Sequence, residues 1–313
     1  MDFKQIKQTQ TLKREAEKFG FWDCRVATAG FLAEAADFLE EWLKNRQHGE
    51  MAFMENYFDL RTDPRKLMPE TQSVVMLAYN YYPEEQQVHK DYQVSKYAYG
   101  RDYHKVIKKK LQKMDAVLKS ELGDFQSRFF VDSAPVMEKQ WAQKSGIGWQ
   151  GKNTNIIHPQ KGSFFFLATY LVDLKLEPDA PIKDYCGSCN KCVEACPTGA
   201  LDEPYTLDAS LCISYLTIEL KKQIPERFKN QMEDWIFGCD ICQDVCPWNR
   251  KFSQSHQEPD FEPRKPIVAF EKEDWENLSE ETFKQHFSGT PIMRTKYEGL
   301  KRNIEFVKKG GNR

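Results

Sequence analysis

CGSCNKCVEACP, residues 186–197, has the C-x2-C-x2-C-x3-C-P spacing of a bacterial iron–sulfur ferredoxin. Three thiolates at this spacing on a tight loop can hold three corners of one cubane cluster. The fourth, Cys196, follows a short turn and points away, so it serves a second cluster. The run therefore predicts a ferredoxin-like domain with two 4Fe–4S clusters.

A second run, CDICQDVCP at residues 239–247, repeats the last three cysteines and the proline but lacks the first cysteine. Cys212, upstream of it, can supply the missing ligand. Zinc is the alternative, because C-x2-C pairs also hold zinc. The two Cys-Pro endings and the absence of a leftover ligand favour iron–sulfur. The predicted ligands are, for cluster 1, Cys186, Cys189, Cys192 and Cys246, and for cluster 2, Cys196, Cys212, Cys239 and Cys242.

The ninth cysteine, Cys24, stands alone in the apolar stretch FGFWDCRV, residues 19–26. We interpret it as a core residue at the start of a buried strand, because a free cysteine packs like a small apolar side chain. The other eight are crowded into one segment, which does not suggest a disulfide framework.

Length, composition and net charge limit the number of domains and the class of protein that this sequence can form. At 313 residues, the chain is expected to form about two domains. Apolar residues make up 40% and charged residues 29%, as in a folded globular protein. A net charge of −2 excludes a globally basic nucleic-acid coat but allows a local basic patch. No apolar run is long enough for a membrane span or signal peptide, so we expect a cytoplasmic protein without a membrane partner.

Upstream of the cysteines, apolar periodicity predicts alternating helices and strands. This alternation indicates an α/β (α+β) domain. We predict three parts: residues 1–180 as this domain, 181–255 as the ferredoxin-like domain, and 256–313 as a wrapping linker with a short helical segment. The predicted helices span 4–20, 31–46, 103–121 and 135–144, and the predicted strands 73–82, 129–132 and 163–174.

A glycine-rich motif, residues 146–151, matches G-x-G-x-x-G. A dinucleotide-binding loop should follow a strand and begin a helix, whereas this motif follows a predicted helix. The context argues against a nucleotide site. A loop that lets the backbone approach a large flat ligand remains an alternative.

Asp132 follows a short apolar strand and precedes the predicted helix 135–144. A carboxylate in this position can face a pocket and hold a proton near neutral pH. It can equally cap the helix that follows, and the residues alone favour the cap.

A basic stretch, which includes Lys105, Lys108 and Lys109, follows the aromatic residues Tyr97 and Tyr99. Basic and aromatic side chains together suit an RNA with splayed bases. A solvated helix face explains the lysines equally well.

Taken together, these stretches resemble the epoxyqueuosine reductase family over about residues 1–305. The resemblance includes both cysteine runs. The other matching stretches are HGEM (48–51), RTDP (61–64), YAYGRDYH (97–104), FVDSAP (130–135), GWQGKN (148–153), GSFFF (162–166), CISYLTIE (212–219) and CPWN (246–249). Longer relatives continue into helical repeats at the C-terminus, so we expect a short form without them.

The resemblance implies a cobalamin enzyme that binds the corrin base-off between the α/β and ferredoxin-like domains. The implied reaction reduces epoxyqueuosine to queuosine at the wobble position of tRNA, the last step of queuosine biosynthesis. Electrons would pass through two 4Fe–4S clusters to cobalamin, and Asp132 becomes the proton donor, whether or not it also caps a helix.

The resemblance also implies partners and contacts. The substrate would be a tRNA with a GUN anticodon that carries epoxyqueuosine, and an external one-electron reductant of flavodoxin or ferredoxin type would supply electrons to a monomer. The candidate RNA contacts are the three lysines named above. From their positions, the candidate cobalamin contacts are Tyr97, Tyr99, Arg101, Gly148, Asn153 and Asp240.

Two other functions are compatible with two iron–sulfur clusters. A reductive dehalogenase joins a similar cobalamin site to two clusters, but such enzymes are usually longer and carry a twin-arginine signal that this sequence does not show. A ferredoxin-type electron carrier needs no α/β partner domain. Corrin binding and the accepted substrate distinguish the three.

Overall fold

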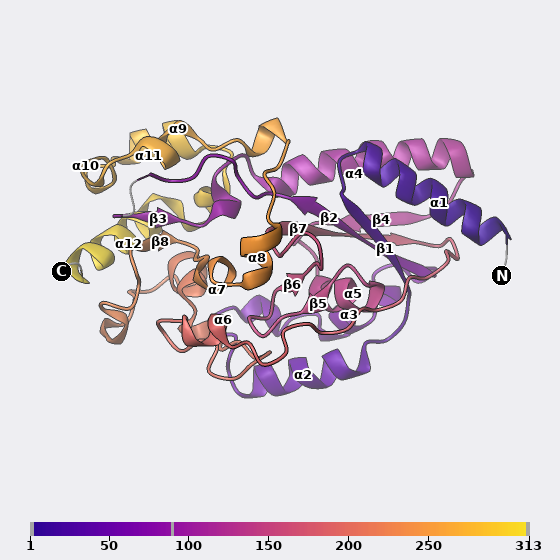
Figure 1. Ribbon diagram of the computed structural model, residues 1–313, viewed down its shortest axis with the longest axis horizontal. Coiled ribbons are helices and arrows are strands. Elements are labelled where there is room, and N and C mark those ends of the chain that lie inside the picture. The colour runs from indigo at the N-terminus through magenta and orange to yellow at the C-terminus, as the bar shows by residue number, and fades with distance from the viewer. Residues whose placement is uncertain (1–2, 89–90, 311–313) are drawn as a thin grey trace.

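An antiparallel four-stranded sheet with strand order β1-β2-β7-β4 lies at one end of the molecule (Figure 1). The computed structural model describes residues 3–88 and 91–310. The two central strands pair along their whole length, from Ser73 opposite Val172 to Asn80 opposite Phe165. The strands span Asp23–Thr28 (β1), Ser73–Asn80 (β2), Ser127–Phe130 (β4) and Phe165–Val172 (β7).

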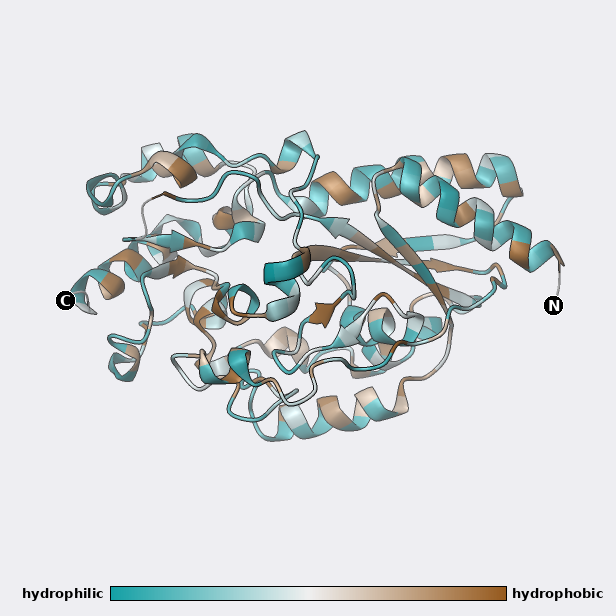
Figure 2. Ribbon diagram, viewed as in Figure 1, coloured by the Kyte–Doolittle hydropathy of each residue, from teal (hydrophilic) through white to brown (hydrophobic). Residues whose placement is uncertain are grey.

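Both faces of this sheet are covered, which explains why β2 is almost continuously apolar. Successive side chains of a strand point to opposite faces. Val75 and Leu77 therefore pack toward one layer, and Val74 and Met76 toward the other. Figure 2 shows hydrophobic stretches along the centre of the sheet, whereas the helices that cover it alternate between hydrophilic and hydrophobic residues. The first layer holds α1 (Phe3–Lys18) and α4 (Tyr103–Leu122), and the second α2 (Ala33–Lys44), α3 (Phe58–Thr62) and α5 (Glu138–Ser145).

The cysteine runs and the C-terminal helices form the other end of the molecule (Figure 1). A second apolar cluster lies there, and it includes Tyr92 and Tyr99 from the first 180 residues. The strand β3 (Gln93–Val94) pairs with β8 (Trp235–Phe237), which carries this early segment into the second core. The helices here are α6 (Lys191–Glu194), α7 (Ile241–Asp244), α8 (Pro247–Phe252), α9 (Lys265–Ala269), α10 (Lys272–Glu276), α11 (Glu280–Phe287) and α12 (Lys296–Gly310).

The mixed α and β fold class predicted from the sequence is confirmed. The main sheet is antiparallel throughout, so the architecture is α+β. The predicted linker after residue 256 is partly helical, and it buries Ile267 and Trp275. The three domain boundaries stay predictions, and their outermost residues, 1–2 and 311–313, lie outside the described residues. No helix in the described part is long and apolar enough to cross a membrane.

Candidate functional site

The cysteines of the two runs gather into two adjacent groups around α6 and α7, which contact each other. In the first group, burial and the nearby Cys186 and Cys246 raise the pKa of Cys192 to about 11. Cys189 lies on the same loop, where its backbone N–H donates to the carbonyl of Cys186 at 3.1 Å.

In the second group, burial and then the neighbouring charges of Cys212 and Asp240 raise the pKa of Cys242, with smaller effects of Cys192 and Cys196. The same two effects, burial first and then Cys242 and Cys212, raise the pKa of Cys239. None of the nine cysteines forms a disulfide. Among residues 3–88 and 91–310, no three His, Cys, Asp or Glu side chains are arranged to hold a single metal ion.

A cavity of about 230 Å³ opens beside the second cysteine group. Its wall combines loops of the α/β part with the cysteine-bearing segments. Two of the predicted cofactor contacts, Tyr97 and Asn153, line it. The other lining residues include Ser95, Lys139, Thr154, Asn155, Thr198, Leu201, Leu207, Ile213, Ser214, Gln243 and the thiols Cys196, Cys212, Cys239 and Cys242.

Asp132 lies on the loop after β4 and adopts the left-handed backbone conformation, with φ +49°. Its carboxylate Oδ2 accepts a hydrogen bond from Tyr103 Oη at 2.6 Å, and His104 Nε2 lies 3.8 Å away. The side chain is 67% exposed and is thus accessible to a substrate. The helix-cap interpretation is wrong, because α5 begins only at Glu138 and its N-cap residue is Met137. The loop is longer than the sequence pattern indicated.

Glu138 and Lys139 connect Asp132 with the cavity. The backbone N–H of Asp132 donates to Glu138 Oε1 at 3.2 Å. Burial, assisted by the charge of Asp132, raises the pKa of Glu138 well above its usual value. Lys139 lines the cavity, burial lowers its pKa, and it interacts with the charges of both Cys242 and Asp132. Lys139 therefore lies near both the acid loop and the second cysteine group.

We expect Glu138→Gln to flatten part of the pH dependence of stability. The raised folded-state pKa of Glu138 means that its stabilising contribution is complete below the unfolded value and is lost as pH rises toward the folded one. Thermal midpoints between about pH 5 and 8 should therefore fall less steeply in this variant than in the wild type. The exposed Glu17→Gln is the matched control. Equal slopes in all three proteins would contradict the burial of a protonated Glu138.

Four predicted cofactor contacts, Tyr99, Arg101, Asp240 and Gly148, are not among the residues that line the cavity. Tyr99 is 4% exposed and belongs to the second apolar cluster. Arg101 forms an ion pair with Asp260 at 3.3 Å. Asp240 is fully buried, where it accepts hydrogen bonds from Ser95 Oγ at 2.5 Å and from the backbone N–H of Lys96 at 2.8 Å. These contacts give each residue a structural role.

Gly148 has a packing role. A Cβ atom there would collide with the carbonyl oxygen of Ile157, because β5 (Trp149–Gln150) and β6 (Ile156–Ile157) run closely side by side. The surrounding G-x-G-x-x-G motif follows α5 and enters this hairpin, so it lacks the strand-to-helix context of a dinucleotide site, as the sequence indicated.

Lys105, Lys108 and Lys109 are exposed on α4. The start of this helix adjoins Asp132 through Tyr103 and His104, whose rings stack at 4.0 Å. The lysine-bearing face therefore begins next to the acid.

Sequence reasoning missed the roles of Tyr103, Glu138 and Lys139. Tyr103 had a usable signal, because it stands between Asp102 and His104 at the start of a predicted helix. Nothing local marked Glu138 or Lys139. Their roles depend on the left-handed turn at Asp132, a conformation that only a few per cent of non-glycine residues adopt.

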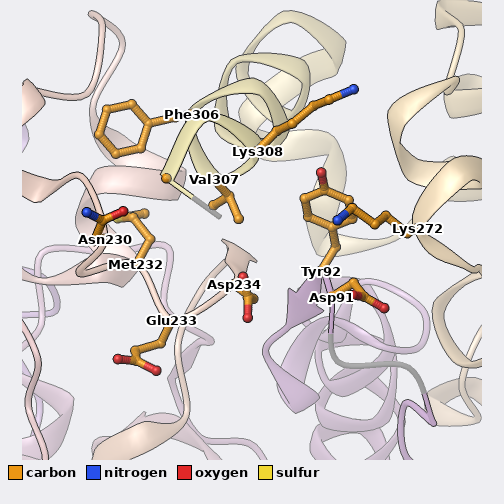
Figure 3. Close-up of a pocket in the computed structure, with 11 residues that line it drawn as sticks. Asp91, Tyr92, Asn230, Met232, Glu233, Asp234, Lys272, Phe306, Val307 and Lys308 are labelled. Atoms are coloured by element: carbon orange, nitrogen blue, oxygen red, sulfur yellow. The ribbon is translucent and has the colours of Figure 1, made fainter. Parts of the chain in front are cut away.

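A second cavity, of about 220 Å³, lies between α12 and the segment before β8 (Figure 3). Tyr92 and Lys272 stand on one side of it, and Asn230 and Glu233 on the other. None of the described residues that line it belongs to the predicted site, so the cavity beside the cysteines is the better candidate.

Two family profiles match the chain. A profile described as epoxyqueuosine reductase QueG, DUF1730, matches residues 61–133, and one described as a 4Fe–4S double cluster binding domain matches residues 185–249. The second profile decides between iron–sulfur and zinc in favour of iron–sulfur.

Related proteins match nearly the whole chain. The epoxyqueuosine reductase of Cellulophaga algicola is 52% identical over 302 residues, which cover 96% of this chain and 98% of that protein. The Escherichia coli K12 epoxyqueuosine reductase is 41% identical over 310 residues, with coverages of 97% and 81%.

Solved structures of epoxyqueuosine reductases also resemble this chain along most of its length. One of an epoxyqueuosine reductase with an epoxyqueuosine-modified tRNA-Tyr stem loop has a TM-score of 0.89 and 30% identity, covering 96% of this chain and 80% of that one. One from Bacillus subtilis, with an aspartate catalytic loop swung out of the active site, has a TM-score of 0.87 and 29% identity, covering 96% and 81%.

Proposed function

Because the chain belongs to the epoxyqueuosine reductase family, we propose that it reduces epoxyqueuosine to queuosine at the wobble position of tRNA, with Asp132 as the proton donor. The observation that carries this proposal is the position of Asp132. It is exposed, held by Tyr103, and close to Lys139, which lines the cavity beside the second cysteine group. The catalytic aspartate loop of the Bacillus subtilis relative supports the same role for this loop.

The family uses two 4Fe–4S clusters and cobalamin, and the residues present fit both kinds of cofactor. Eight thiols in two groups match the ligands that two clusters require. Leu201, Leu207 and Ile213 offer apolar surface to a corrin plane, and the amides of Asn153 and Asn155 can bind its polar edge. We propose base-off binding in this cavity, between the α/β part and the cysteine-bearing segments.

Reduction of the epoxide to the alkene consumes two electrons and two protons and releases one water. When bound, the clusters and cobalamin supply the electrons. Asp132 donates a proton to the epoxide oxygen, because an oxygen that leaves as a protonated group departs more readily than an alkoxide. Tyr103 orients this carboxyl group through its hydrogen bond to Oδ2. His104, 3.8 Å away, is placed to return a proton to Asp132.

The two cysteine groups differ in their surroundings. All four thiols of the second group line the cavity, whereas those of the first group do not. This arrangement supports electron entry on the side of Cys186 and delivery on the side of Cys242. The external flavodoxin- or ferredoxin-type donor and the monomeric state stay predictions.

The direct test is anaerobic turnover of an epoxyqueuosine-containing tRNA stem loop with a GUN anticodon by the cofactor-loaded protein. Nucleoside analysis should show queuosine. A loaded protein that leaves the epoxide intact but dehalogenates halogenated organic compounds would overturn the proposal in favour of a reductive dehalogenase. A protein that holds about eight irons without any corrin would instead be an electron carrier.

We expect the double variant Lys108→Ala/Lys109→Ala to bind the tRNA stem loop more weakly. Both side chains are exposed on α4 and would contact phosphates. Loss of two such contacts should make the slope of log K against log salt concentration less steep by about 1.4–1.8. The kcat at saturating RNA should stay unchanged. The exposed Lys229→Ala, far along the chain, is the control. An unchanged affinity and salt slope would place the RNA elsewhere.

A further inference from the structure

The segment 149–153, from the α/β part, reaches both cysteine-bearing loops. Trp149 Nε1 donates to Cys186 Sγ at 3.4 Å. Lys152 Nζ donates to the carbonyl of Gly187 and to Asn190 Oδ1, both at 2.8 Å. Asn153 Nδ2 donates to the carbonyl of Cys242 at 3.2 Å. This short segment therefore holds the ligand loops in place, and one of its side chains contacts a ligand sulfur directly.

Trp149 is a fixed donor. Its side chain is 1% exposed and packs in a small apolar cluster with Ile157 and Cys246. Tyr185 and Trp248 contact its ring in edge-to-face geometry, with centroids at 5.3 and 4.8 Å. These neighbours prevent the indole from rotating away, so its N–H is held toward Cys186 Sγ.

An N–H group that points at a ligand sulfur affects the two oxidation states of a cluster unequally. Reduction adds one electron from a one-electron donor, transfers no proton and breaks no bond. The reduced cluster carries one more negative charge, and a hydrogen bond to a charged acceptor strengthens as that charge grows. The bond therefore stabilises the reduced form more, and hydrogen bonds to sulfur are an established determinant of cluster potential.

We propose that Trp149 raises the reduction potential of cluster 1 through its N–H···S bond to Cys186. The inference rests on the proposed function, because it takes Cys186 as a ligand. Lys152 adds a buried positive charge on the same loop and acts in the same direction. It also anchors the loop through two hydrogen bonds, so Trp149 is the cleaner residue to test.

The test is an anaerobic redox titration of the cofactor-loaded protein, followed by electron paramagnetic resonance. Trp149→Phe keeps an aromatic ring among the apolar side chains around position 149 but removes the N–H donor. We expect the midpoint of one cluster to become more negative and that of the other to stay unchanged. Trp248→Phe is the matched control, because Trp248 packs against the same ring and has no hydrogen bond to a ligand sulfur among the described residues.

Three outcomes would overturn the inference: unchanged midpoints in Trp149→Phe, equal shifts of both clusters, or an equal shift in Trp248→Phe. The last would assign the effect to packing. If the variant folds poorly, a measurement on the wild-type protein tests the same inference. With ¹⁵N-indole tryptophan, pulsed resonance should detect nitrogen coupling to reduced cluster 1, and its absence would also overturn the role of Trp149.

Iron content separates this failure from that of the proposed function. A wild-type protein with about eight irons and unshifted midpoints in Trp149→Phe loses only the role of Trp149. A wild-type protein that assembles no pair of clusters overturns the proposed function, and this inference with it.

Discussion

Asp132→Asn is expected to lose turnover by about 10²–10⁴-fold while both kinds of cofactor stay bound. The amide has nearly the shape of the carboxyl group and can still accept the hydrogen bond from Tyr103, so the loop should keep its conformation. It cannot transfer a proton to the epoxide oxygen. The loss should therefore appear in the single-turnover rate constant for conversion of the epoxyqueuosine stem loop at saturating enzyme.

The control for this variant is Asp59→Asn, another exposed aspartate whose side chain forms an ion pair with Lys66. It should turn over like the wild type. Iron content and the cobalamin spectrum establish that Asp132→Asn is loaded. If the loaded variant keeps turnover within a few-fold of the wild type, Asp132 is not the acid and the proton comes from another group.

Cys189→Ala is expected to lose cluster 1 and much of the stability of the cysteine-bearing part. The loop between Cys186 and Cys192 is surface-exposed and contributes no residue to the large apolar clusters among the described residues. Such a loop depends on its metal ligands for its conformation, so loss of one ligand should also promote local unfolding. Iron should fall from about eight to about four per chain, with a lower thermal midpoint.

The matched control is Cys24→Ala. Cys24 is 7% exposed in the apolar cluster under α1, where burial raises the pKa of its thiol, and it lies outside both cysteine runs. It should keep all its iron and lose only about 1 kcal/mol of stability from the smaller side chain. A Cys189→Ala protein that still holds eight irons would show that the ligand assignment is wrong.

Spacing between near neighbours in the chain carries most of what the sequence by itself determined. Cluster ligands must lie at set intervals on a loop, so the two cysteine runs can be recognised from the sequence alone. The double-cluster profile matches both of them. Helix periodicity and the apolar runs of β2 and β7 likewise depend on neighbouring residues, and the corresponding predictions fall close to the observed elements. Iron–sulfur chemistry and the α and β content were therefore available from the amino-acid order.

Contacts between segments that are distant in the sequence could not be predicted from the amino-acid sequence. The antiparallel pairing of β2 with β7, the link from Asp132 through Lys139 to Cys242, and the bond from Trp149 to Cys186 each join segments that are far apart in the sequence. The cofactor contacts suggested for Tyr99 and Arg101 stay predictions, and only the structure shows that Tyr99 packs in a core and that Arg101 forms an ion pair. Such contacts form only when the layers close, because burial of apolar faces, rather than proximity along the chain, selects which side chains meet.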